Sequence, residues 1–561
     1  MIEIENLNKT YKLDNGEVTA LKDINLKVKD GEIVGIIGRS GSGKTSLLRI
    51  LRGVEDFDSG RVKVADAEVK SDSSKYYFNK LKKETAIHLQ RSFGLWPESA
   101  FNNVIKKLYA TKYGDESMVD FDLANDYYGD EARKLLEIVG LKDKIDHYAP
   151  VLSGGEKQRL IIARQLAKKP KVLLLDEPAT MACPKTKQSI LEAVKNINKE
   201  LNVTVVLVSH LPEIHRYLSD RLILLKDGEI KKEGNTEEII DEFLEDIEEE
   251  IPLDDSRTSE EIIKVKDLYK RYYLLTGGSV LEIKDINFNL NKEDILSIVG
   301  TSGAGKTLLL KMMAGLEQAE RGEVLYKSNN NFWTDINKVS LERMDIRRNL
   351  GFMHQEFALS HYATVRSQLA VRLGFKNNDI VDYAKKKAKE LNLSDELLDS
   401  LYNLTDLPEI EAKNRLEQVG LVPEILHELF PKFPDNAVKD EVREIFDGLD
   451  LSLDILDRKS YELSGGQKVR ATLALALCSK PDILFLDEPF GDLDPLTLRI
   501  VSNSIKKINK QLKTTIIIIS HNINFIKELS KTAILIKDGE LIDTGNTLEI
   551  LNKFSNFCEF S

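Results

Sequence analysis

Apolar and polar positions follow the same order twice along the chain. Each half opens with alternating stretches, IEIENLNKTY and ALKDINLKVKDG in the first, and IIKVKDLYKRY and LEIKDINFNLNKED in the second. Such alternation predicts half-buried strands. Continuous apolar runs follow, namely EIVGII, VLLLD and VTVVLVS in the first half, and DILSIV, ILFLD and TTIIIIS in the second. Apolar strands separated by helical stretches are typical of a buried parallel sheet covered by helices. The pattern therefore predicts an α/β protein built from two long repeats.

The repeats differ in one large way. Gln90 lies 63 residues before Ser153, whereas Gln355 lies 109 residues before Ser464, so the second half is 46 residues longer there. The added stretch has leucines and charges at helical spacing, with prolines as breakers. We expect an enlarged helical insertion at about 376–457. Its segments RLEQVGL and EIFDGLDL both resemble LLEIVGL of the first half, which raises a duplicated helical hairpin as one origin. A docking surface is our hypothesis for this insertion, and simple helical padding is the alternative.

The junction between the repeats is rich in carboxylates. It reads DEFLEDIEEEIPLDDSRTSEE. Like-charge repulsion and poor burial predict an exposed helix end followed by a linker. We therefore expect a first domain at 1–245, an acidic linker at 246–261 and a second domain at 262–561.

Each repeat carries the same phosphate-binding signature. GRSGSGKT (38–45) and GTSGAGKT (300–307) both fit G-x-x-x-x-G-K-[ST], and both lie between a strand-like run and an apolar helical run. The glycines let backbone N–H groups approach a phosphate, the lysine reaches the β- and γ-phosphates, and the hydroxyl binds Mg²⁺. A phosphate loop alone indicates a nucleotide-binding protein, and the residues expected to bind the nucleotide here are Gly38, Ser40, Gly41, Gly43, Lys44, Thr45, Ser46, Gly300, Ser302, Gly303, Gly305, Lys306, Thr307 and Leu308. Thr45 and Thr307 are also expected Mg²⁺ ligands.

Composition narrows the class of protein. The chain has 561 residues and a net charge of −12, which argues against broad binding to nucleic acid or to anionic membranes. Three cysteines without a C-x-x-C pair indicate a reducing compartment and no cysteine-ligated cluster. The sequence shows no secretory signal and no apolar run approaching 18 residues. We expect a cytoplasmic protein that does not itself insert into a membrane.

Three further motifs recur in both halves. LSGGEKQR (152–159) and LSGGQKVR (463–470) each precede a strand ending in Asp-Glu-Pro, and a later strand in each half ends in Ser-His. This constellation resembles the ATP-binding cassette superfamily over nearly the whole chain. The resemblance implies two tandem P-loop NTPase domains, each with a RecA-like parallel core, an antiparallel β subdomain and a helical subdomain. It implies ATP and Mg²⁺ as cofactors and an ATPase reaction.

The resemblance also implies roles for individual residues. Asp176 and Asp487 would hold Mg²⁺, with Gln90 and Gln355 completing its coordination and coupling the site to a partner. Glu177 and Glu488 would polarise the attacking water as general bases. His210 and His521 would contact the γ-phosphate. Tyr11 would stack on adenine. Its counterpart in the second half is Tyr272 counted from upstream or Tyr273 counted from downstream, and we favour Tyr272.

In this superfamily two cassettes pack head to tail. The resemblance then implies that Ser153 and Gly155 complete the ATP site of the second half, and that Ser464 and Gly466 complete that of the first. ATP binding would close the dimer and hydrolysis would release it. One position departs from the pattern. The second half has the usual FGDLDP with Asp494, whereas the first has ATMACP, which puts Cys183 in that place. We predict that the site built on Lys306 is the more altered of the two.

Several kinds of twin-cassette protein remain at this point. Twin-cassette translation factors usually join their cassettes by a long basic linker, whereas the junction here is short and acidic. Ribosome-recycling proteins carry cysteine clusters at the N-terminus, and this sequence has none there. A fused importer ATPase that docks on membrane subunits stays open.

A closer resemblance exists to one archaeal family. It is carried by QRSFGLWPESAFNNV, ATMACPKTKQ, the insertion LTDLPEIEAKNRLEQVGL…ILHELFPKFP, and DRKSYELSGGQKVRATLALAL. These resemble the ATPase of the methyl-coenzyme M reductase activation system of methanogens, its component A-two. The resemblance implies methyl-coenzyme M reductase and its activation complex, with iron–sulfur electron carriers, as partners.

Overall fold

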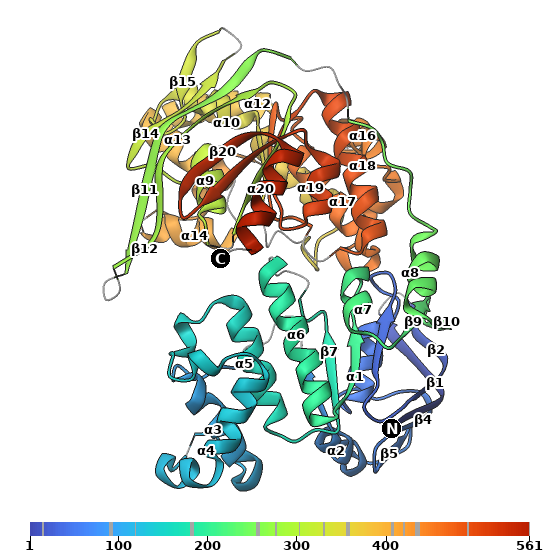
Figure 1. Ribbon diagram of the computed structural model, residues 1–561. Coiled ribbons are helices and arrows are strands. Elements are labelled where there is room, and N and C mark those ends of the chain that lie inside the picture. The colour runs from blue at the N-terminus through green and yellow to red at the C-terminus, as the bar shows by residue number, and fades with distance from the viewer. Residues whose placement is uncertain are drawn as a thin grey trace. The chain divides into compact units, whose positions relative to one another are not determined.

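The computed structural model divides into two compact units. It describes residues 1–561 except 14–15, 89–93, 118, 180–183, 254–257, 275–277, 302, 329–330, 355–358, 406–408, 419–420, 432–437, 491–492 and 560–561. The first unit is Met1–Ile247 with Asp492–Leu496, and the second is Glu248–Gly491 with Thr497–Ser561. Figure 1 colours the chain by residue number, so that Met1–Ile247 of the first unit runs from blue to green and the rest of the chain from green to red.

Each unit is built on a mostly parallel sheet. Among the described residues, the first unit has six strands in the order β10-β9-β3-β8-β7-β6, and the second repeats this order as β20-β19-β13-β18-β17-β16. Only the edge pairs β9–β10 and β19–β20 run antiparallel within these two described sheets. The strands are β3 (Ile33–Ile37), β6 (Thr85–His88), β7 (Val172–Asp176), β8 (Thr204–Val208), β9 (Arg221–Lys226) and β10 (Glu229–Gly234), then β13 (Ile295–Gly300), β16 (Leu350–Met353), β17 (Ile483–Asp487), β18 (Thr515–Ile519), β19 (Thr532–Lys537) and β20 (Glu540–Asn546).

The central strands are buried on both faces. Every residue of β3, β7 and β8 is buried, and so is every residue of β13, β17 and β18. Continuous apolar runs satisfy such positions because helices cover both sides of the sheet. The predicted α/β repeat is therefore confirmed.

A second, antiparallel sheet accompanies each parallel sheet. In the described part of the chain its order is β2-β1-β4-β5 in the first unit and β12-β11-β14-β15 in the second. These strands are β1 (Ile2–Leu13), β2 (Gly16–Val28), β4 (Ser59–Val64) and β5 (Ala67–Lys70), then β11 (Glu261–Leu274), β12 (Gly278–Asn291), β14 (Arg321–Lys327) and β15 (Trp333–Asp335). The register of β11 against β12 shifts between Tyr272 and Tyr273.

Helices connect and cover the strands. Those of the first unit are α1 (Lys44–Leu51), α2 (Lys75–Glu84), α3 (Ala100–Tyr113), α4 (Phe121–Ile138), α5 (Gly154–Leu166), α6 (Pro184–Leu201), α7 (Pro212–Leu218) and α8 (Thr236–Leu244). The later ones are α9 (Lys306–Met313), α10 (Leu341–Arg348), α11 (Val365–Lys376), α12 (Asn378–Glu390), α13 (Asp395–Leu404), α14 (Glu409–Gln418), α15 (Glu424–Leu429), α16 (Val438–Gly448), α17 (Gly465–Leu477), α18 (Pro495–Leu512), α19 (Ile523–Leu529) and α20 (Thr547–Glu559). In Figure 1, α3, α4 and α5 form a helical group of the first unit.

The insertion of the second unit has a core of its own. Apolar side chains of α12, α13, α14 and α15 cluster with Met344 of α10 and Phe430. A buried ion network ties α13 to α10, because Asp399 lies 2.5 Å from Arg343 Nη2 and 3.7 Å from Arg347 Nη1. Arg347 Nη2 also donates to the Gly315 carbonyl, just after α9. The insertion is thereby fixed to the helix that begins with Lys306.

Residues of the acidic junction are hydrogen-bonded to helix α18. Lys506 Nζ donates to Glu250 Oε1 at 3.0 Å and to the Ile251 carbonyl at 2.8 Å. Asn503 accepts from Ile251 N at 3.0 Å and donates to the Glu249 carbonyl at 2.9 Å. Glu248, Glu249 and Glu250 are solvent-exposed, while the backbone of this stretch is hydrogen-bonded to the second unit.

Of the helices that the structure describes, none combines the length and the apolar composition that a bilayer crossing requires.

Candidate active sites

The first phosphate loop runs from β3 to α1. A β-carbon at Gly38 would lie 2.2 Å from the Leu225 carbonyl oxygen, and Gly43 has φ +101° with the Ala20 carbonyl similarly close, so both positions require glycine. Lys44 is 8% exposed, and its Nζ donates to the carbonyls of Gly38 and Arg39 at 2.7 Å each. Burial lowers the pKa of Lys44. A phosphate at the α1 N-terminus would exchange these carbonyl partners for anionic oxygens.

The second phosphate loop repeats this geometry. A β-carbon at Gly300 would lie 2.2 Å from the Ile536 carbonyl oxygen. Lys306 Nζ donates to Gly300 O at 3.0 Å and to Thr301 O at 2.9 Å. Gly41 and Gly303 both have positive φ, and a β-carbon added at either would meet none of the described atoms within 4 Å, so each loop is open at the same point. Leu308 is buried in the apolar core, which leaves only its backbone for a ligand.

An aspartate ends the neighbouring strand in each unit and meets the loop threonine. Thr307 Oγ1 donates to Asp487 Oδ1 at 3.0 Å, and Asp176 is hydrogen-bonded to Thr45. Burial raises the pKa of Asp176, and burial raises the pKa of Asp487 to about 6. A desolvated carboxylate beside a hydroxyl suits a hard divalent cation, which would compensate the buried charge. Both pairs therefore fit Mg²⁺.

The glutamate that follows each aspartate is held in a left-handed conformation. Glu177 has φ +51° and Glu488 has φ +46°, a region that costs energy for a residue with a side chain. In the first unit Glu177 Oε1 contacts His210 Nδ1 at 2.7 Å and accepts from His210 N at 3.1 Å. Ser209 Oγ donates to the other carboxylate oxygen at 3.1 Å. The carboxylate is thus oriented from the end of β8.

The second unit uses the other ring nitrogen of its histidine. His521 Nε2 lies 2.9 Å from Glu488 Oε1. Burial opposes ionisation of Glu488, but the hydrogen bond and charge of His521 outweigh it and hold the pKa of Glu488 below its usual value. Within the described residues, His210 Nε2 is buried and makes no hydrogen bond. The two histidines therefore meet their glutamates through different ring nitrogens, Nδ1 in His210 and Nε2 in His521.

The LSGG serines cap two helices. Ser153 caps α5 and forms a reciprocal capping box with Glu156, and Ser464 caps α17 with Gln467. Both serines are exposed. A β-carbon at Gly155 would lie 2.2 Å from Thr186 Cγ2, so close packing against α6 requires glycine. Gly466 faces Thr497 with more room, at 3.3 Å. Each helix presents its N-terminus behind an exposed serine, and the partial positive charge at a helix N-terminus suits an anion.

The two candidate adenine-stacking tyrosines have matching partners. Tyr11 OH donates to Glu55 and lies 2.9 Å from Ser46 Oγ. Burial, together with a hydrogen bond to Glu317, raises the pKa of Tyr272 to about 12. Glu55 and Glu317 each follow a helix-ending glycine by two residues. Tyr272 thus corresponds to Tyr11, and the register shift after Tyr272 explains why counting from upstream and from downstream disagree.

Some predicted residues lie outside the described residues. These are Gln90, Gln355, Ser302 and Cys183, and the side chain of Tyr273. Other contributors were missed from the sequence, namely Ser209, Glu55 and Glu317. Glu55 and Glu317 lie equally far along the sequence from the two phosphate-loop lysines, and this repetition could have identified both glutamates.

Comparisons with known proteins agree with this geometry. A family model described as ABC transporter matches residues 21–180 and 283–491. An uncharacterised ABC transporter ATP-binding protein of Methanocaldococcus jannaschii is 45% identical over 557 residues, which covers 99% of this chain and 96% of the relative. A second such protein of that organism is 30% identical, covering 98% of this chain and 96% of the relative.

Two further matches cover different shares of this chain. A methionine import ATP-binding protein of Clostridium tetani is 38% identical over 239 residues, covering 43% of this chain and 70% of the relative. A solved structure titled RNase-L Inhibitor matches 99% of this chain and 93% of its own, with a TM-score of 0.56 and 19% identity. At that identity the likeness concerns the fold alone.

Proposed function

The chain belongs to the ABC transporter family of ATP-binding cassette proteins, and from this membership we propose that it uses ATP hydrolysis to remodel a soluble partner complex. The ABC ATPase family uses ATP with Mg²⁺. Hydrolysis of ATP is supported by the duplicated site. A phosphate loop, a Thr–Asp pair and a Glu–His pair recur in each unit.

Different residues of the chain bind the phosphates, hold Mg²⁺ and orient the attacking water. The loop lysine and the α1 N-terminus hold the β- and γ-phosphates, and Thr45 with Asp176 would hold Mg²⁺. When bound, Mg²⁺ neutralises charge that develops on the phosphates. Glu177, oriented by His210 and Ser209, accepts a hydrogen bond from the attacking water and aligns it with the γ-phosphate. Thr307, Asp487, Glu488 and His521 take the corresponding positions in the second unit.

We further propose that the partner is methyl-coenzyme M reductase with its iron–sulfur activation complex. Support comes from the resemblance carried by QRSFGLWPESAFNNV, ATMACPKTKQ and the insertion. The insertion also supports an asymmetric partner, because α12, α13, α14 and α15 enlarge one unit only and pack around a separate apolar core. In this proposal ATP supplies conformational work, and other proteins supply the electrons that reduce the nickel cofactor.

Purification of the native protein with mass spectrometry of the bound chains tests the partner. We expect reductase subunits to co-purify, and we expect the activation of purified reductase to require both ATP and this chain. Co-purification of integral membrane subunits without reductase subunits would reject the proposed partner. It would leave the ATPase assignment standing.

A transporter ATPase is the second candidate function. The observation that favours it is the 38% identity of one cassette-sized segment to a methionine import ATP-binding protein. Reconstitution separates the two candidates, because ATP turnover stimulated by reductase supports the first and turnover stimulated by membrane permeases supports the second.

A further inference from the structure

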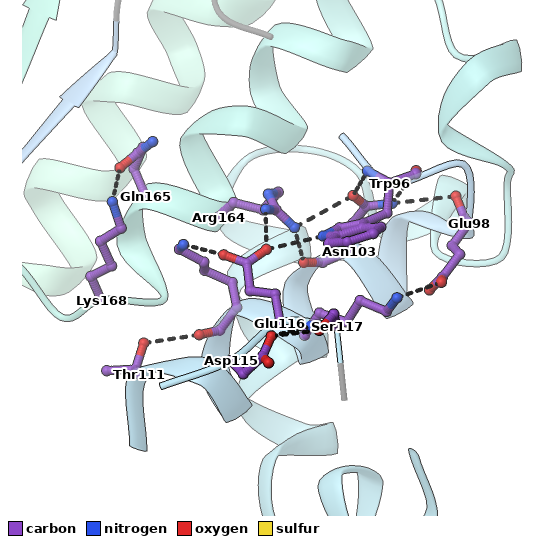
Figure 2. A network of polar contacts seen from close by, with 12 residues as sticks. Trp96, Glu98, Asn103, Thr111, Asp115, Glu116, Ser117, Arg164, Gln165 and Lys168 are labelled. Carbon is purple, nitrogen blue, oxygen red and sulfur yellow. Dashed lines mark hydrogen bonds and ion pairs between the residues drawn. The ribbon is translucent and has the colours of Figure 1, made fainter. Parts of the chain in front are cut away.

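A network of ion pairs and hydrogen bonds, in which Arg164 is buried and Glu116 is partly buried, joins the segment after Gln90 to the LSGG helix of the first unit. Figure 2 shows Glu116 at its centre, between Trp96 and Arg164. Glu116 Oε2 accepts from Trp96 Nε1 at 3.0 Å and from Arg164 Nη2 at 2.7 Å, and Lys107 donates to its other oxygen. Burial opposes this charge, but the bonds from Lys107, Trp96 and Arg164 hold the pKa of Glu116 at about 2. The carboxylate is therefore ionised and saturated with donors.

Arg164 carries the connection into α5. Its side chain is buried, and its Nη1 donates to the Asn103 carbonyl at 2.6 Å. Asn103, which is fully buried, accepts from Trp96 N at 2.8 Å and donates to the carbonyls of Trp96 and Ser99 at 3.0 Å each. The residues 94–99, helix α3 and helix α5 are thus joined through Arg164. We call Glu116, Arg164 and Asn103 the signature lock.

The second unit keeps only part of this arrangement. Gln368 holds the segment after Gln355 as Asn103 does, since it accepts from Ser360 N at 2.8 Å and donates to the Ala363 carbonyl at 3.2 Å. The position that corresponds to Arg164, eleven residues after the LSGG serine, is Leu475. Leu475 is a buried apolar side chain of α17, which cannot donate a hydrogen bond or bear charge. Among the described residues, the arginine-based connection from the segment to the LSGG helix is therefore seen in the first unit, and Leu475 stands at its position in the second.

We propose that Glu116 and Arg164 are positioning residues for ATP hydrolysis, which lock the segment 94–99 to α5 so that the LSGG serine, Ser153, moves with the segment that follows Gln90. A partner that engages this segment shifts Ser153 directly. In the second unit Leu475 stands at the position of Arg164, and its apolar side chain supplies no directional hydrogen bond that would couple α17 to the segment. The inference rests on ATP hydrolysis, and not on the identity of the partner.

Steady-state ATP turnover by the full chain tests the lock. Arg164→Leu installs the residue of the second unit, Glu116→Gln removes one charge at nearly constant shape, and Arg164→Lys is the conservative variant. Asp130→Asn is the matched control, because Asp130 is exposed on α4 and pairs with Arg133 at the surface. The variants are measured in a Glu177→Gln background, in which the site built on Lys306 supplies the remaining hydrolysis. There we expect Arg164→Leu and Glu116→Gln to lower kcat about tenfold, with the KM for ATP changed less than about twofold. Arg164→Lys should restore part of kcat.

Hydrogen exchange supplies a readout that mere loss of packing would not give. Exchange should rise together in 94–99 and at the start of α5, and stay unchanged in α1. Thermal melting checks folding, and Glu116→Gln decides the matter if Arg164→Leu does not fold. A kcat for Glu116→Gln equal to that of Asp130→Asn overturns the proposal, as does increased exchange in only one of the two segments. If the unmodified chain shows no ATP turnover, the family function fails instead, and the exchange result alone decides the lock.

Discussion

The two units place the same reactive groups on the same sheet order but support them differently. In the first unit Glu177 meets His210 Nδ1, and the LSGG helix is joined to its neighbours by Arg164. In the second, Glu488 meets His521 Nε2, and Leu475 replaces the arginine. The second unit adds instead a buried network between its phosphate-loop helix and its insertion. The groups expected to bind and hydrolyse ATP are thus present in both units. The contacts that hold the surrounding helices differ, since Arg164 makes them in the first unit and Arg347 and Asp399 in the second.

The largest effect should come from the network of the insertion. Asp399→Ala leaves Arg343 and Arg347 buried without their counter-ion, so we expect the second unit to lose about 3–5 kcal/mol of unfolding free energy. The measurement is chemical unfolding followed at Trp333 in a Trp96→Phe background, because these are the two tryptophans of the chain. Asp440→Ala is the matched control, because it breaks an exposed pair with Arg443 on α16 of the same unit and should cost far less, since solvent screens such pairs. Equal losses for the two variants would show that the insertion is not anchored by Asp399.

A smaller effect is expected at Glu116 in the first unit. The folded pKa of about 2 lies below the usual 4.5, so the network stabilises the fold above about pH 4.5 and loses this contribution as the pH falls towards 2. Glu116→Gln should therefore cost about 2 kcal/mol at pH 7, after allowance for partial exposure, and much less at pH 3. Unfolding followed at Trp96 in a Trp333→Phe background measures both values. A cost that does not change with pH would contradict the ionised state of Glu116.

The smallest effect should appear at the paired tyrosines. Tyr11→Phe and Tyr272→Phe each remove a hydroxyl bonded to a glutamate but keep the aromatic ring. We expect less than about 1 kcal/mol of lost stability and less than about a twofold change in the KM for ATP. Tyr11→Ala and Tyr272→Ala should raise the KM clearly if the rings stack on adenine. Unchanged KM values for both alanine variants would remove these residues from the nucleotide site.

The sequence was sufficient for the fold because the signals were local and repeated. Continuous apolar runs before GRSGSGKT and GTSGAGKT predicted the buried parallel strands, and both units have them in the same order. The strand-ending Asp176 and Asp487 lie beside the loop threonines because parallel strands end at one edge of the sheet.

Other features were beyond a reading of the sequence because they depend on tertiary contacts. Arg164 stands in the helical stretch IIARQL, and only the fold brings Glu116 to it. The choice between Tyr272 and Tyr273 depended on a register shift within β11, which a count along the chain does not reveal. The acidic junction suggested a solvated linker, yet Lys506 and Asn503 hold its backbone.

The most direct test of inequivalent sites is the ATP turnover of Glu177→Gln and Glu488→Gln measured separately in the full chain. Removal of a general base should lower hydrolysis at its own site by a factor on the order of 10² or more. Cys183 stands where the second half has Asp494, and the site built on Lys306 is expected to be the more altered. We therefore predict unequal residual rates, with Glu488→Gln retaining more turnover than Glu177→Gln. Equal residual rates would contradict the central claim.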